Sequence, residues 1–310
     1  MPAPSARGIL PGMDARDRER LASARSLLRP CRVCPRNCRV DRPGGERGRC
    51  GIGADPVVSS AGPHFGEEPP LVGRGGSGTI FLAGCNLLCS FCQNYDISHV
   101  PAEASAQAGG RRGETMSPAD LAGLMRRLES RGCHNINFVT PTHVMPHLLE
   151  AILLARDAGL TVPVVWNCGG YESVEALRLL ARHVEIYMPD AKFMNADSAE
   201  RYLAARDYPE RMRAAILEMQ RQVGDLVIDG GVATRGLLVR HLVMPGHGED
   251  SRRVIDFLAE VSPRCCVNVM GQYRPLFRAD EFPEINRRPL PDEVAKVKSY
   301  ALKRGLRVDA

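Results

Sequence analysis

The chain has 310 residues, of which 44% are hydrophobic, and a formal net charge of +5. That length and composition can bury one sizeable core, alone or with a small appendage, and require no second large domain. The first 30 residues contain no apolar signal region, and no stretch approaches the ~18 consecutive apolar residues of a membrane span. We therefore expect a soluble, cytoplasmic protein with no membrane partner.

The positive charge is concentrated at the amino-terminal end. Residues 1–50 hold 12 arginines, no lysine and 5 acidic residues, a charge of +7, so the remainder carries −2. A basic end of this kind can bind nucleic acid. Several of the arginines stand among cysteines, where cations offset the charge of thiolates (Arg32, Arg36, Arg39, Arg47 and Arg49). We favour a solvated or cluster-facing role for them over an RNA-binding arm.

The predicted elements alternate along the chain. A helix at 14–28 is followed by a cysteine-rich loop at 31–50 and a Gly/Pro-rich linker at 61–78. Strands are expected near 79–83, 135–139, 162–166, 184–188, 237–243 and 265–270. Helices are expected at 118–130, 146–158, 172–182, 197–222, 250–261 and 292–304, and a hairpin at 226–238. Six strand–helix units with apolar strands imply a parallel sheet covered by helices, either doubly wound or barrel-shaped.

Four cysteines in the first loop form a complete set of potential metal ligands. Cys31, Cys34, Cys38 and Cys50 follow the pattern C-x2-C-x3-C-x11-C, with glycines in the last interval that favour a tight loop. Four thiolates suit structural zinc, whereas Cys34-Pro35 is similar to the Cys-Pro of ferredoxin loops. We expect a bound metal, either zinc or an auxiliary iron–sulfur cluster, on an N-terminal segment spanning 1–70; free thiols are the alternative.

Three further thiols follow the first predicted strand. Cys85, Cys89 and Cys92 have C-x3-C-x2-C spacing. Three thiolates can hold three irons of a 4Fe–4S cluster and leave the fourth iron free to bind a substrate or cofactor. A zinc site would be expected to close with a fourth nearby ligand, which this loop lacks. Buried free cysteines are the remaining alternative.

This run resembles the signature of the radical S-adenosylmethionine (SAM) superfamily. The resemblance implies that Cys85, Cys89 and Cys92 are the catalytic cluster ligands, and that SAM binds the open iron and is cleaved reductively to a 5′-deoxyadenosyl radical. It also implies that Phe91 lies beside the adenine. An incomplete (β/α)6 barrel at 71–310 and a low-potential electron donor such as flavodoxin or ferredoxin are expected with it.

In such barrels the chemistry gathers where the strands end. The second strand ends in the turn Thr140-Pro141-Thr142-His143, where many radical SAM enzymes have Gly-Gly-Glu-Pro. We include Thr140 among the SAM contacts, acting through the backbone of the turn. We expect His143 either to cap the following helix or to face the substrate.

The third and fourth strands end in polar side chains as well. Asn167 ends the third strand, and Asp190 and Lys192, which share a face of extended backbone, follow the fourth. This Asp-x-Lys resembles a pair in pyruvate formate-lyase activating enzymes that contacts SAM, and Asn167 falls near the expected ribose. The alternative for the pair is an ordinary surface salt bridge.

The fifth strand carries Arg240, a plausible bidentate partner for the SAM carboxylate. His241 should face the opposite side and pack. Beyond this strand the Gln272-Tyr273-Arg274-Pro275 run is similar to the PflX-like group of radical SAM proteins, a resemblance that spans roughly residues 31–305.

Three functions remain open on this basis. The first is hydrogen abstraction from a protein or peptide, as in activating enzymes, with the basic cysteine-rich segment helping to dock the partner. The second is action on a small metabolite or nucleotide. The third is a non-catalytic iron–sulfur or zinc-ribbon binding protein, in which the three-cysteine set would be structural. We prefer the first.

Overall fold

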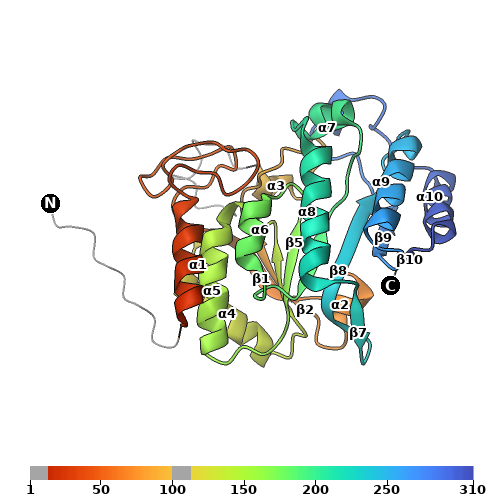
Figure 1. Ribbon diagram of the computed structural model, residues 1–310. Coiled ribbons are helices and arrows are strands. Elements are labelled where there is room, and N and C mark those ends of the chain that lie inside the picture. Colours follow the sequence, from red (N-terminus) through yellow and green to blue (C-terminus); the bar gives the residue numbers. More distant parts are fainter. Residues whose placement is uncertain (1–12, 100–112, 310) are drawn as a thin grey trace.

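A computed structural model describes residues 13–99 and 113–309 of the chain (Figure 1). Residues 1–12, 100–112 and 310, which fall within the predicted units 1–70 and 71–310, lie outside the described residues. Within the described ranges, no helix is both long and apolar enough to cross a membrane.

The described strands form a mostly parallel sheet. They are β1 Val57–His64, β2 Ser77–Leu82, β3 Glu114–Thr115, β4 Ile136–Val139, β5 Val164–Cys168, β6 Ile186–Pro189, β7 Val227–Asp229, β8 Val232–Leu242, β9 Cys266–Met270 and β10 Arg307–Val308. The order is β10-β9-β8-β6-β5-β4-β2-β1-β3, with β7 paired to β8. The run from β2 to β10 is parallel, and β1 and β3 extend it in antiparallel fashion. The path has two open ends.

Helices follow most of the parallel strands. They are α1 Ala15–Ser26, α2 Pro69–Val72, α3 Tyr95–Ser98, α4 Pro118–Ser130, α5 Met145–Asp157, α6 Val174–Leu180, α7 Ala196–Leu203, α8 Tyr208–Val223, α9 Gly248–Val261 and α10 Pro291–Lys303, with 3-10 turns Thr142–Val144 and Ala279–Glu281. Figure 1 shows the long helices side by side in front of the sheet. The helices therefore cover this face of the sheet, and the buried side chains of the strands and helices form the main core.

Local signals explain several element ends. Ser117 caps α4 and forms a capping box with Asp120, which satisfies amide groups at the start of the helix. The predicted hairpin is confirmed, since Asp229 pairs with Val232 and the two intervening glycines both have positive φ.

Two predicted elements were wrong. Part of the expected linker forms β1, which pairs with β2 and places residues 57–64 in the sheet. The expected helix at 197–222 is two helices, because Ala204 takes a left-handed φ of 50° after α7, and Pro209 lies in the first turn of α8. The mostly parallel α/β architecture and all six predicted strands are confirmed.

Candidate active site

Residues 84–92, here called the cluster loop, leave the sheet directly after β2. Gly84 has a φ of 79°, and a Cβ atom there would lie 2.6 Å from the carbonyl oxygen of Cys50. Only glycine fits this approach, because a side chain would meet both backbone strain and a fixed carbonyl. The N-terminal cysteine segment, residues 31–50, therefore packs directly against the base of the cluster loop.

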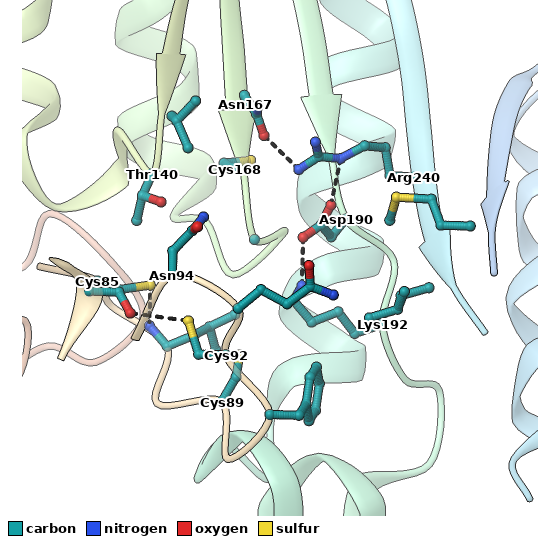
Figure 2. Close-up of a pocket in the computed structure, with 18 of the residues that line it drawn as sticks. Cys85, Cys89, Cys92, Asn94, Thr140, Asn167, Cys168, Asp190, Lys192 and Arg240 are labelled. Atoms are coloured by element: carbon teal, nitrogen blue, oxygen red, sulfur yellow. Dashed lines mark hydrogen bonds and ion pairs between the residues drawn. The ribbon is translucent and has the colours of Figure 1, made fainter. Parts of the chain in front are cut away.

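A cavity of about 270 Å³ lies between the cluster loop and the carboxyl ends of the strands. Its walls include every residue that the sequence nominated for cluster or SAM binding in the barrel: Cys85, Cys89, Phe91, Cys92, Thr140, Asn167, Asp190, Lys192 and Arg240. Figure 2 shows the three cysteines facing the strand-end side chains across this space. The pocket thus brings together side chains from distant parts of the sequence, since Cys85 and Arg240 are more than 150 positions apart.

The strand-end side chains form a continuous charged chain. The Asp190 carboxylate accepts from Lys192 Nζ at 2.5 Å and from Arg240 Nε at 2.9 Å, and Arg240 Nη2 donates to Asn167 Oδ1 at 2.7 Å (Figure 2). The side chains of Asp190 and Lys192 are each 13% exposed, and that of Arg240 is 18% exposed. The pair is therefore a buried pair at the pocket wall and not a surface salt bridge.

Burial and charge act in opposite directions on these groups. Burial raises the pKa of Asp190, but the Arg240 and Lys192 cations more than offset it and hold the pKa below its usual value. Burial alone lowers the pKa of Lys192, and the Asp190 carboxylate raises it above the usual value. Both side chains are consequently charged near neutral pH, which suits recognition of a zwitterionic ligand.

Phe91 and Thr140 both line this pocket. The Phe91 ring is 4% exposed and contacts the rings of Phe193 and Tyr273, with centroids 6.2 and 5.8 Å away. Thr140 has a φ of 61°, which is rare for a β-branched residue, and its amide donates to Asn167 O at 2.9 Å. Strained backbone of this kind clusters at binding sites.

The turn after β4 also supports the cluster loop. His143 is buried, and its Nε2 donates to the carbonyl oxygen of Ala83 at 2.8 Å. Burial, together with the nearby Arg42 guanidinium, lowers the pKa of His143 to about 3, so the ring is neutral. Neither expected role of His143 is met, because it points at the end of β2 and not at a helix amide or the pocket. His241 packs as expected, between Ala191 O and Ser251 Oγ.

The cysteine segment is held in shape by hydrogen bonds within its own backbone. Arg49 N donates to Cys38 Sγ at 3.3 Å, and the backbone of the segment is closed by the bonds Cys31 N to Val40 O and Arg39 N to Cys31 O. Cys34 lines a separate hollow of about 410 Å³ bordered by α6 and α8. Figure 1 shows this loop beyond the end of α1.

All eleven cysteines of the chain are described, and all are free thiols. Among the residues that the structure describes, no three His, Cys, Asp or Glu side chains are grouped so as to hold a metal ion as they stand. The four other cysteines, Cys133, Cys168, Cys265 and Cys266, are buried.

Some residues of the site escaped the sequence analysis. Glu67 lies 3.9 Å from Arg240, and burial, partly offset by Arg240, raises its pKa to about 7. Glu67 lies in the segment that was taken for a linker, so its Glu-Glu pair was not considered. Ser98 and Gln272 also line the pocket, and Ser98 Oγ lies 3.1 Å from Cys92 Sγ.

Comparison with known proteins identifies the family. Residues 79–258 match the model of the radical SAM superfamily, which is more than half of the chain. The uncharacterised protein MJ0674 of Methanocaldococcus jannaschii is 34% identical over 91% of this chain and 77% of its own length. The uncharacterised protein MJ0808 of the same organism is 22% identical over 89% of this chain and 79% of its own. The chain belongs to the radical SAM superfamily.

Solved structures with similar folds include SuiB of Streptococcus suis. The form bound to its precursor peptide SuiA has a TM-score of 0.46 at 11% identity, and covers 73% of this chain and 46% of that one. The form bound to SAM has a TM-score of 0.43 at 13% identity, and covers 74% and 45%. This chain thus spans less than half of each SuiB chain.

Membership makes the protein an enzyme that uses a 4Fe–4S cluster, SAM and a reductant. The pocket residues fit that cofactor pair chemically. Three thiols provide ligands for three irons, and Cys168, which also lines the pocket, instead bonds with Glu172. The opposite wall offers a cation and a carboxylate for the two ends of an amino acid.

Proposed function

We propose that the enzyme cleaves SAM reductively at a cluster held by Cys85, Cys89 and Cys92, and directs the resulting 5′-deoxyadenosyl radical to hydrogen abstraction from a protein or peptide. The observation that carries the SAM site is the single pocket in which these thiols face the Asp190 network. The incomplete (β/α)6 barrel is supported by the six predicted strands, β2, β4, β5, β6, β8 and β9, which are parallel neighbours in a sheet whose two ends stay open.

The pocket residues would divide the work of binding SAM. Asp190 is charged and suits the amino group of the methionine moiety, and Arg240 suits its carboxylate. Lys192 holds the Asp190 carboxylate in place, and Asn167 orients the Arg240 guanidinium from the other side. The strained Thr140 turn and the Phe91 ring would enclose the nucleoside portion and exclude water from it.

We also propose that Cys31, Cys34, Cys38 and Cys50 bind a second metal, zinc or an iron–sulfur cluster. The proposal is supported by the amide of Arg49, which donates to Cys38 Sγ, because hydrogen bonds to the cysteine sulfurs are typical of iron–sulfur sites. A second support is Arg42, which is 1% exposed, whose Nη2 has no hydrogen-bond partner among the described residues, and whose charge acts on Cys50. A buried cation needs a nearby anion, and a metal with four thiolates supplies one.

The choice of a protein or peptide substrate rests on the resemblance to activating enzymes and the PflX-like group. Flavodoxin or ferredoxin is the donor we propose. A small metabolite or nucleotide bound in the pocket is the second candidate, favoured by the polar Gln272 in its wall. A purely structural role for the three-cysteine set is not proposed, because the chain belongs to an enzyme family.

The test is formation of 5′-deoxyadenosine under reductant after anaerobic reconstitution. Changing Cys85, Cys89 and Cys92 together to Ala should abolish it. The matched control changes three buried cysteines outside the pocket, Cys133, Cys265 and Cys266, to Ala and should retain it. Undiminished product from the first variant would sink the assignment.

A further inference from the structure

Two arginines of the cysteine segment connect it to the cluster loop: Arg36 contacts Asn86 directly, and Arg42 acts through His143. We propose that Arg36 and Arg42 are positioning residues, which fix the cluster loop to the cysteine segment so that this segment controls how tightly the pocket binds SAM. This inference rests on the proposed function of the cluster loop. Neither arginine touches the pocket itself.

Arg36 forms the first link. Its Nε donates to the carbonyl oxygen of Asn86 at 2.7 Å, inside the cluster loop. Its other nitrogens donate to the carbonyl oxygens of Leu203, at 3.1 Å, and Ala204, at the end of α7. Its guanidinium carbon also lies 5.2 Å from the centre of the Tyr171 ring. Only a planar, many-donor side chain can hold three carbonyls of two segments at once.

Asn86 is held by hydrogen bonds to two different parts of the chain. Its carbonyl accepts from Arg36, and its side-chain Nδ2 donates to Tyr171 O at 2.6 Å. The residue is buried and lies next to Cys85 in the chain. The position of the Cys85 thiol is therefore set by a peptide held from both the cysteine segment and the strand-end loop after β5.

Arg42 forms the second link through an intermediate. It donates from Nη1 to the carbonyl oxygen of His143 and from Nε to that of Gly53 at 2.9 Å. His143 in turn donates from Nε2 to Ala83 O at 2.8 Å, one residue before Gly84. A chain of hydrogen bonds thus joins the interior of the cysteine segment to the point where the cluster loop begins.

Direct packing supports the same coupling. The carbonyl oxygen of Cys50 sits against Gly84, where a Cβ atom would approach to 2.6 Å. Three contacts therefore fix the start of the cluster loop on both sides of Cys85. They come from Arg36, Arg42 and Cys50, which all belong to the cysteine segment. A shift of the segment must move the loop or break these contacts.

The test measures SAM affinity and the electron paramagnetic resonance (EPR) signal of the reduced cluster in the reconstituted full chain. Arg36→Gln removes both the guanidinium group and its charge, and Arg36→Lys keeps the charge but removes the guanidinium group. Both should weaken SAM binding by roughly tenfold or more and alter the change that SAM causes in the EPR signal. The control is Arg32→Gln, since Arg32 lies in the same segment but pairs with Glu175 on α6; it should stay within about twofold of the parent.

Fluorescence of Trp166, the single tryptophan, which is fully buried in β5, reports whether the barrel remains folded. Parent-like SAM affinity and EPR signal in both folded Arg36 variants would overturn the inference, and so would full rescue by lysine alone. Should the Arg36 variants unfold, the second link decides: His143→Leu should weaken SAM binding and His143→Gln, which keeps a donor, should weaken it less. Equal, parent-like binding in both would overturn the proposal. If the parent itself bound no SAM, the proposed function would fail instead.

Discussion

The Lys192–Asp190 pair gives the sharpest prediction about the SAM pocket. Lys192→Met keeps most of the side-chain volume and removes the charge that holds Asp190 in place. Each charge-assisted hydrogen bond contributes about 1.5–3 kcal/mol, which at ~1.4 kcal/mol per decade corresponds to a roughly tenfold to hundredfold loss of SAM affinity. Breaking a buried pair costs about 3–5 kcal/mol of stability, and we expect the lower end because Asp190 keeps Arg240 at 2.9 Å.

The assay is isothermal titration of SAM into the reconstituted variant, with iron content and urea unfolding measured on the same preparation. Lys296→Met is a matched control, because Lys296 lies at the same 2.5 Å from Asp292 but the two side chains are 75% and 71% exposed. An exposed pair contributes at most about 1 kcal/mol, so this variant should bind SAM as the parent does. If Lys192→Met also bound SAM like the parent, Lys192 and Asp190 would be only a structural ion pair.

Three further predictions concern other parts of the molecule. Burial, partly offset by hydrogen bonds, raises the pKa of Glu172 to about 7. Because the folded state binds this proton more tightly than the unfolded chain, the free energy of unfolding should fall as pH rises from about 4.5 to 7. Urea titrations at pH 5 and 8 should show that Glu172→Gln reduces this loss of stability by up to about 3 kcal/mol, and an unchanged pH profile would refute the prediction. Thr140→Gly should change the unfolding free energy by less than about 1 kcal/mol, because relief of the strained φ offsets the entropy of glycine, whereas Val139→Gly in regular strand should cost clearly more. The Cys85, Cys89 and Cys92 triple Ala variant should retain one metal site at Cys31 to Cys50; metal analysis that found neither zinc nor iron would leave those cysteines as plain thiols.

The parallel core was predictable because each of its strands is a short apolar run. Because the carboxyl ends of parallel strands meet at one edge of the sheet, the sequence also predicted that Asn167, Asp190 and Arg240 share a site. The strand β1 escaped because Gly62 and Pro63 near its end signal a loop, and its pairing with β2 is a tertiary contact. The break between α7 and α8 carries no glycine; Pro209 was the one local signal.

The hydrogen bonds by which Arg36 and Arg42 connect to the cluster loop could not be predicted from the sequence, for a different reason. Their positions among the cysteines suggested only that they balance thiolate charge. The carbonyls that they contact, at Asn86 and His143, are backbone atoms, which leave no trace in residue type. Glu67 was missed similarly, since its nearness to Arg240 follows from the path of the loop after β1.

We propose that Cys85, Cys89 and Cys92 hold a cluster with one iron open to SAM. The most direct test is EPR spectroscopy of the reconstituted, reduced parent protein before and after SAM is added. We expect a 4Fe–4S signal that changes on addition of SAM and is lost from the triple Ala variant. A signal that is indifferent to SAM, or that persists without these three cysteines, would contradict it.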